Sequence, residues 1–264
     1  MERRTVFSSR SSRVARGGLI AALALSIAGG VSPSGAFAAD DEPLIYYPTF
    51  SGASKTLERN GSADILTSSG RLHQRILRLT AGGYRQVGSA WSRTKLDLGE
   101  SFESTFKVYL HHFQPGADGI AFLVQDDGPR ALGGWGGGLG YRGIVRSVAV
   151  EFDTFQNSTD PSNNHLAVVM GGNPDHHSAV GEPSIPLYGK PFLARVNYDA
   201  DSNDLRIYVK SLRAGSEEEL ALQTTVDLAD EVGSSSAWVG FTAATGNALS
   251  KQDIYSWTVD GSGA

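Results

Sequence analysis

Hydrophobic and polar residues alternate along much of the chain after residue 40. Apolar residues recur at every second position within residues 102–110, which predicts a strand with one buried face. Residues 120–124 are apolar without interruption, as expected for a strand buried on both faces. Only residues 227–232 could form a helical turn. Further strands are predicted over residues 192–198, 205–209, 238–243 and 254–259.

This series of short strands predicts the fold class. Many strands joined by tight turns are typical of an all-β protein built as an antiparallel β-sandwich or jelly roll. The chain has 32 glycines, which suit many turns, and it has no cysteine, so disulfide bonds cannot stabilise it. No repeat or linker interrupts residues 39–264, which predicts one domain.

The first 38 residues differ from the rest and predict a signal peptide. Five arginines occur before residue 17, and a run of small and apolar residues follows over 17–31. Ala36-Phe37-Ala38 then offers a cleavage site, so residues 1–38 are expected to be removed. The apolar run is shorter than the roughly 20 residues that span a bilayer. The mature chain is therefore expected to be secreted, and the leader is of a bacterial type.

The charge of the chain argues against nucleic acid as a partner. The formal net charge is −5 at pH 7, and no basic block occurs outside the first sixteen residues. No second long apolar run follows the leader, so no membrane insertion of the mature chain is expected.

A cluster of ligand-type side chains lies between residues 148 and 165. On a strand, Val148, Val150 and Phe152 would point to the core, and Glu151 and Asp153 to the other face. Two neighbouring carboxylates repel unless a cation neutralises them or one takes up a proton. Carboxylates suit Ca²⁺, and an added imidazole suits a transition ion such as Mn²⁺. A solvated acidic strand edge fits the same spacing. The loop that follows adds Asn157, Asp160 and His165.

Five motifs span nearly all of residues 40–260. Residues 148–165 read VAVEFDTFQNSTDPSNNH. The other motifs are LRLT at residues 77–80, GADGIAF at 116–122, GGGLGY at 136–141, and VGFTAATG at 239–246 with IYSW at 254–257. In the same order, these motifs resemble those of the legume-type (L-type) lectin family, and residues 148–165 are similar to its metal-binding signature.

The resemblance implies a concanavalin A-like fold and two bound ions. It implies that an Mn²⁺-like ion is held by Glu151, Asp153, Asp160 and His165. It implies that a Ca²⁺ ion is held by Asp153, the carbonyl of Phe155, Asn157 and Asp160. Two carboxylates would then bridge two cations, which removes their repulsion.

The resemblance also implies a shallow sugar site and glycans as partners. Asp118, after a cis peptide bond from Ala117, would accept hydrogen bonds from sugar hydroxyls. A backbone N–H near Gly137 and the side chain of Asn157 would complete the polar contacts, and Phe155 would stack on the sugar ring. Asn247 or its neighbours would form the rim. An oligomer is possible.

The chain departs from plant members of the family in two places. The loop from Asn157 to Asp160 is shorter and lacks their aromatic residue, and residues 168–172 read VVMGG where they have D-V-N-S. These changes leave the sugar undetermined, as does the loop over residues 245–252, which sets specificity in such lectins.

Two other functions are compatible with the fold. A laminarinase-like glycoside hydrolase needs a second glutamate after the E-x-D pattern of Glu151 and Asp153. Gln156 or Phe155 stands there, and neither can transfer a proton, so no enzyme activity is expected. An adhesion module would keep the fold without the sugar site. A secreted, metal-dependent lectin is the favoured function.

Remaining histidines and tryptophans have structural interpretations. Adjacent histidines on a strand face opposite sides, so residues 111–112 and 175–177 are expected in surface loops. Trp91 and Trp257 are expected in the core. Trp135, which lies among glycines beside the presumed sugar loop, is a candidate for glycan contact.

Overall fold

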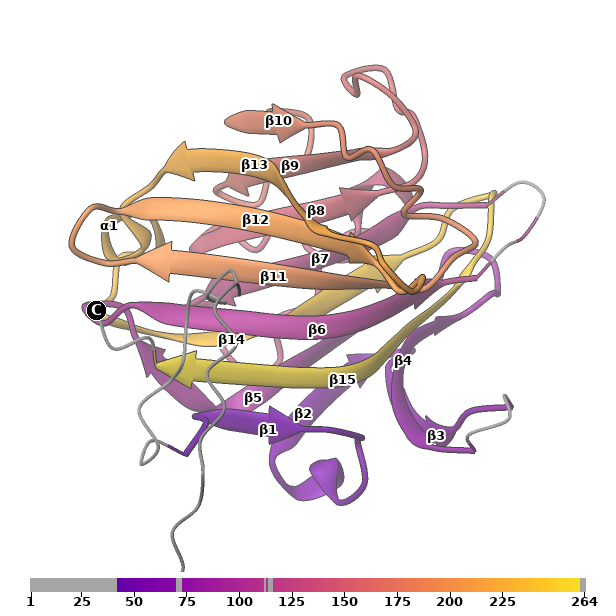
Figure 1. Cartoon of the computed structure of the whole chain (residues 1–264), viewed down its shortest axis with the longest axis horizontal. Helices are drawn as coiled ribbons and strands as arrows, with labels where there is room; N and C mark the ends of the chain where they lie inside the picture. The colour runs from indigo at the N-terminus through magenta and orange to yellow at the C-terminus, as the bar shows by residue number, and fades with distance from the viewer. Residues whose placement is uncertain (1–41, 70–72, 112, 114–115, 262–264) are drawn as a thin grey trace, which may run out of the picture. The chain divides into compact units, whose positions relative to one another are not determined.

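Two antiparallel sheets form the protein, as seen in a computed structural model that describes residues 42–69, 73–111, 113 and 116–261. In Figure 1 the eight-stranded sheet faces the viewer and the seven-stranded sheet lies behind it. The eight-stranded sheet runs in the order β13-β12-β11-β6-β15-β4-β3, with β1 paired to β15. Its strands are β1 (Ile45–Tyr47), β3 (Asp64–Thr67), β4 (Arg75–Ala81), β6 (Phe102–Leu110), β11 (Phe192–Asp199), β12 (Asp204–Ser211), β13 (Glu218–Thr225) and β15 (Lys251–Gly261).

The seven-stranded sheet runs in the order β10-β9-β8-β7-β14-β5-β2. Its strands are β2 (Leu57–Gly61), β5 (Val87–Asp97), β7 (Gly119–Gln125), β8 (Ser147–Asp153), β9 (His165–Met170), β10 (Ala179–Gly181) and β14 (Ser236–Ala244). Every segment predicted as a strand is a strand, and β6 has the predicted bounds.

The main core lies between the two sheets. Phe106 of β6 packs against Phe122 of β7 and Phe241 of β14, with ring centroids 5.6 Å and 4.9 Å away. Phe241 also meets Trp257 of β15 edge-on at 4.9 Å. Buried and half-buried residues alternate along β6, which is the period-2 pattern read from its sequence. Trp91 and Trp257 are fully buried, as predicted.

The seven-stranded sheet is covered on its outer face as well. Residues of the 131–144 loop, among them Leu139, Tyr141 and Ile144, pack on Ala121, Leu123 and Ala149 as a second apolar cluster. The loop contains the short 3-10 helix η2 (Gly136–Gly138) and turns at Leu139 and Gly140, whose φ angles are 46° and 79°. Consequently β7 and β8 are buried on both faces, and the face of β8 that carries Glu151 is not a solvated edge.

Helical structure is scarce within the described residues. The α-helix α1 (Leu228–Val232) lies where a helical turn was predicted, and the Asp227 side chain caps it by accepting from the N–H of Asp230. One more 3-10 turn, η1, covers Ala53–Lys55. None of the helices in this part of the chain has the length and apolar character needed to cross a bilayer. The predicted signal peptide, residues 1–38, lies outside the described residues.

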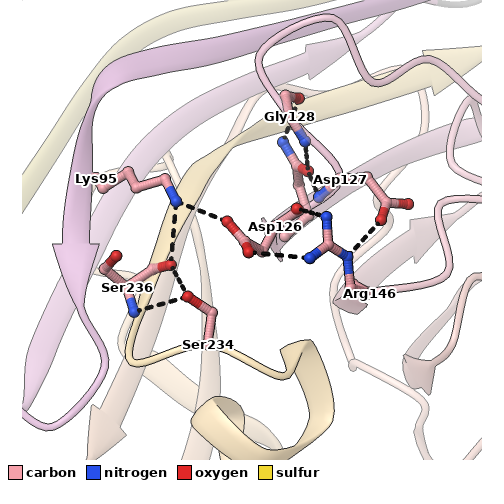
Figure 2. A network of polar contacts seen from close by, with 8 residues as sticks. Lys95, Asp126, Asp127, Gly128, Arg146, Ser234 and Ser236 are labelled. Atoms are coloured by element: carbon pink, nitrogen blue, oxygen red, sulfur yellow. Dashed lines mark hydrogen bonds and ion pairs between the residues drawn. The ribbon is translucent and has the colours of Figure 1, made fainter.

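The paired strands β7 and β8 have two chemically different ends. Gly119 pairs with Asp153 at one end, the site end, and Gln125 pairs with Ser147 at the other, the distal end. Figure 2 shows the distal end, where Lys95 and Arg146 neutralise two acids that follow β7. The Nζ of Lys95 lies 2.6 Å from Asp126, and Arg146 contacts Asp126 at 3.2 Å and Asp127 at 3.0 Å.

Candidate functional site

Acidic side chains gather where β8 ends and β9 begins. Glu151 and Asp153 are 1% and 3% exposed, and they lie on the face of β8 opposite Phe152, which packs in the main core. Antiparallel pairing sets Asp153 directly opposite His165, the first residue of β9. The loop between the strands brings Asp160 to the same place, with its Oδ2 accepting from the N–H of Asn157 at 2.5 Å.

Two buried atoms of this cluster have no hydrogen-bond partner. The Oε1 of Glu151 accepts from the hydroxyl of Tyr141, but its Oε2 has no partner. The Nε2 of His165 is likewise unpartnered, whereas its Nδ1 donates to the carbonyl of Ser162 at 2.9 Å. A carbonyl can only accept, so Nδ1 carries the proton and Nε2 presents a lone pair. Buried polar atoms are rarely left unpaired, so each calls for an occupant of the site.

Ligand-type atoms meet here in two groups that share one histidine. The atoms of Asp153, Asp160 and His165 lie within 4.8 Å of one another, and so do those of Glu151, His165 and His177. The four side chains predicted from the sequence to hold a transition ion are therefore brought together. Carboxylate oxygens with imidazole nitrogen form a donor set suited to a divalent transition ion, and the oxygens suit Ca²⁺.

His177 belongs to this cluster, contrary to the prediction that residues 175–177 lie in a surface loop. Its side chain is only 8% exposed, and its Nε2 lies 3.6 Å from Glu151 Oε2 and 3.7 Å from Asp160 Oδ1. The glycine pair at residues 171–172, both with positive φ, turns the chain after β9 into the connection to β10, which pairs antiparallel with β9. The glycine pair signalled a turn after β9, but nothing in the local sequence showed that the connection brings residue 177 to Glu151.

The other histidine predictions have mixed outcomes. His176 is exposed, as expected for a surface loop. His111 lies just after β6, outside the strand. It is half-buried, and its Nε2 lies 2.7 Å from the buried carboxylate of Asp253 on β15. Residue 112 lies outside the described part of the chain.

Burial shifts the pKa values of the cluster. Loss of solvent raises the pKa of Glu151 to about 8, and the charge of Asp160 adds to the rise. Burial, followed by the charge of Glu151, holds the pKa of Asp153 well above its usual range. Burial lowers the pKa of His165, which keeps its imidazole neutral. The acids thus need either protons or a cation, and the neutral imidazole is in the form that binds a metal.

Asp118 lies beside this cluster with an unpartnered carboxylate oxygen. It follows a cis peptide bond from Ala117, as the family resemblance implied, and is only 4% exposed. Its carbonyl accepts from both the N–H and the hydroxyl of Thr154, at 2.8 Å and 2.9 Å, which ties it to the residue after Asp153. Its Oδ2 has no partner, and burial raises its pKa to about 7.

The glycine loop and the Asn157 side chain complete a small polar surface. A Cβ atom built on Gly137 would come 2.7 Å from Asn157 Oδ1, so the amide lies directly against this glycine. The N–H of Gly136 donates to the carbonyl of Thr245 at 3.1 Å, which joins the loop to the end of β14. A Cβ built on Gly246 would lie 3.6 Å from Asp118 Oδ2. Three segments distant in sequence therefore meet around Asp118.

Two predicted site residues lie at the edge of this surface. Phe155 is half-buried. Its backbone N–H donates to Asp153 Oδ1 at 2.7 Å, which holds this residue next to the acidic cluster. Asn247 is exposed next to Gly246. The structure places these residues near Asp118, while their contact with a ligand stays a prediction.

An exposed aromatic side chain flanks the same surface. Trp135, about half exposed, precedes η2, and the guanidinium of Arg85 lies 4.5 Å from the centre of its ring. The N–H of Arg85 donates to the carbonyl of Gly246 at 3.2 Å. Because both residues are anchored to the loops around Asp118, Trp135 remains a candidate for ligand contact.

Comparisons with known proteins agree with this geometry. The family model described as the legume lectin beta-barrel domain matches residues 51–257. A lectin from Onobrychis viciifolia is 30% identical over 184 residues, which cover 64% of this chain and 70% of that protein.

Solved structures resemble the protein along most of its length. The basic winged bean lectin with Tn-antigen has a TM-score of 0.69 and 25% identity, covering 81% of this chain and 96% of that one. The lectin from Bauhinia forficata in complex with GalNAc has a TM-score of 0.67 and 25% identity, covering 83% and 97%. The predicted all-β sandwich is therefore confirmed.

Proposed function

Because this chain belongs to the legume lectin family, we propose that it is a carbohydrate-binding protein whose shallow site is ordered by Ca²⁺ and a transition ion. The observation that carries the proposal is the position of Asp118. Its unpartnered carboxylate oxygen lies beside Gly246, which packs against Gly136 of the glycine loop, and its backbone carbonyl is tied through Thr154 to the acidic cluster. A sugar hydroxyl is the kind of donor that such an oxygen lacks.

Each polar group would have a separate role towards a sugar. The Asp118 carboxylate accepts from hydroxyl groups, and the Asn157 amide with the N–H near Gly137 forms further hydrogen bonds. The half-buried Phe155 ring offers an apolar face for the ring carbons, and Asn247 borders the rim. Membership of a non-enzymatic family also confirms that the chain is not an enzyme.

The residues fit the two ions that the family implies. The unpartnered atoms of Glu151 and His165 point to a transition ion held by Glu151, Asp153, Asp160 and His165. The carboxylates of Asp153 and Asp160, with the Phe155 carbonyl and Asn157, supply oxygen ligands for Ca²⁺. The ions would neutralise the buried acids and thereby hold the loop that carries Phe155 and Asn157.

A galactose-type glycan is the first ligand to test. The winged bean and Bauhinia forficata proteins are described with Tn-antigen and GalNAc, respectively, and each is 25% identical to this chain. We also propose that residues 1–38 direct export, which secretion of the full-length chain with loss of this segment would test.

A glycan array tests the proposed function. Protein treated with a chelator and protein resupplied with Ca²⁺ and Mn²⁺ are compared on the same array. Binding to one glycan class only in the resupplied sample is the expected result. Equal binding in excess chelator would contradict metal dependence, and binding to no glycan under either condition would contradict the lectin function.

A further inference from the structure

The four predicted ligands of the transition ion include one imidazole, that of His165. The structure brings a second imidazole, that of His177, to the same position. We propose that His177 is a direct ligand of the transition ion and that it strengthens the preference of this position for Zn²⁺ over Mn²⁺. The inference rests on the proposed metal dependence and adds a ligand and an ion preference to it. It concerns a residue on the connection between β9 and β10, outside the segment of residues 148–165.

The distances around His177 suit a shared ion better than a hydrogen bond. Its Nε2 is 3.6 Å from Glu151 Oε2 and 3.7 Å from Asp160 Oδ1, beyond the usual hydrogen-bonding range of about 2.7–3.2 Å. Two ligands that each lie roughly 2.0–2.2 Å from one zinc ion are at most about 4.4 Å apart. Both separations therefore leave room for an ion between the atoms.

Independent support comes from the atoms that face His177. Glu151 Oε2, which lies 3.6 Å from His177 Nε2, is buried and unpartnered, and so is the lone-pair nitrogen of His165. The rings of His165 and His177 have centroids 5.5 Å apart, which places the two imidazoles on one cluster. A single ion bound by all three side chains would satisfy both unpartnered atoms at once.

The loop that carries His177 is held in place by specific contacts. Arg142 donates to both oxygens of Asp175, at 2.5 Å and 2.8 Å, which fixes the loop two residues before His177. The N–H of Ser178 then donates to the carbonyl of Val168 at 2.8 Å. Contacts on both sides of His177, at Asp175 and at Ser178, therefore restrict the position from which its side chain reaches Glu151. Ligands positioned in this way bind with less loss of side-chain freedom.

The added imidazole shifts the relative affinity of the position further towards Zn²⁺, which N/O sites already bind more tightly than Mn²⁺. Carboxylate and water oxygens suit Mn²⁺, whereas imidazole suits zinc and the other later ions. Two imidazoles with carboxylates therefore make the position richer in nitrogen than the four predicted ligands alone. The competing explanation is that a protonated His177 acts as an internal counter-ion for Glu151 and Asp160. In that case the imidazole would compete with a metal instead of binding it.

Metal titration of matched variants separates these explanations. Chelator-stripped protein is titrated with Zn²⁺ alone and Mn²⁺ alone, using His177→Gln and, as the control, His176→Gln. His176 is the exposed neighbour in the same loop. We expect His177→Gln to weaken Zn²⁺ binding by at least about tenfold, with a smaller loss for Mn²⁺, and His176→Gln to leave both unchanged. Unchanged or tighter Zn²⁺ binding by His177→Gln would overturn the inference.

X-ray absorption at the zinc edge of the unmodified protein gives a second test that needs no variant. Two coordinated imidazoles are expected, and one would refute the role of His177. Neither measurement uses a sugar. A protein that binds Zn²⁺ through His177 but binds no glycan would therefore contradict only the lectin function. A protein that binds glycans, but whose Zn²⁺ affinity does not depend on His177, would contradict only this inference.

Discussion

The two ends of the β7 and β8 pair treat negative charge in opposite ways. At the distal end, Lys95 and Arg146 neutralise Asp126 and Asp127 in partly exposed ion pairs (Figure 2). At the site end, Glu151 and Asp153 are almost fully buried, and neither forms an ion pair with lysine or arginine in the described part of the chain. The acids of the distal end thus have lysine and arginine partners, whereas the two buried acids of the site end have none among the described residues.

This difference suggests two roles for the acids at the two ends of β7 and β8. The paired acids of the distal end contribute to stability, and the buried acids of the site end contribute to ligand binding. A buried carboxylate without a partner is costly, so it takes up a proton or a cation. The raised pKa values of Glu151 and Asp153 express that cost, and the unpartnered atoms of Asp118 and His165 show where an occupant would bind. Changes at the site end should therefore affect ligand binding, and changes at the distal end only stability.

The largest expected effect is on glycan binding when Asp118 becomes asparagine. The amide offers one acceptor and adds donors that face the donors of the sugar, and each charge-assisted hydrogen bond is worth roughly 1.5–3 kcal/mol. Losing two should reduce binding below detection. Asp126→Asn at the distal end is the matched control and should bind normally. Glycan binding and melting temperature are measured on the same samples, and a folded Asp118→Asn protein that still binds would refute the assignment.

Removal of the ions should act on stability and binding together. An ion that binds only the folded state stabilises it, by about 2.7 kcal/mol when its concentration is 100 times Kd. Chelation should therefore lower the melting temperature and abolish glycan binding of the unmodified protein. Asp153→Ala should resemble the chelated protein and respond little to chelator, while Asp126→Asn should respond fully. Calorimetric melting with and without chelator checks this, and a full response of Asp153→Ala would contradict it.

The chelated protein should lose stability as the pH rises from about 6.5 to 8. The pKa values of Asp118 and Glu151 are raised to about 7 and about 8, so the folded chain holds protons that the unfolded chain has released. Raising the pH removes those protons and lowers the free energy of unfolding. Above about 6.5 histidine is mostly neutral in the unfolded chain, so the lowered pKa of His165 contributes little there.

Chemical unfolding at several pH values measures this slope. Glu151→Gln should make the slope smaller, because the amide does not titrate while Asp118 still does, and saturating ions should make it smaller in the unmodified protein. A slope of opposite sign in chelator would show that the buried acids are already compensated within the chain.

The predicted parts of the molecule are those that depend on local sequence. The alternation over residues 102–110 predicted β6 with its bounds, and the strand period placed Glu151 and Asp153 on one face. Asp160 and His165 lie near them because the connecting loop is short. Asp118 was found only through the family resemblance, because no sequence pattern around residue 118 indicates that it lies close to Asp153.

The unpredicted parts depend on contacts between distant segments. Tyr141 reaches Glu151 because the glycine-rich loop folds over the outer face of the sheet, and such a loop has no periodicity that shows which face it covers. His177 was missed because its position depends on the turn at residues 171–172 and on the contact between Arg142 and Asp175. A side chain in a loop can be placed only when the partners of that loop are known.

The smallest expected effect is at the distal end. Arg146→Met removes both ion pairs of a side chain that is 51% exposed and keeps much of its aliphatic length. Exposed ion pairs contribute about 0.2–1 kcal/mol, because solvent screens them, so the free energy of unfolding should fall by no more than about 1 kcal/mol. The loss should shrink at high salt. Glycan and metal affinities should match those of the unmodified protein, because the hydrogen bonds and ion pairs of the Arg146 side chain go to Asp126 and Asp127 at the distal end. Denaturant unfolding at low and high salt, together with binding to the same glycan array, measures both effects. A clear loss of glycan binding would mean that the two ends are coupled and that the division between structural and functional charge is wrong.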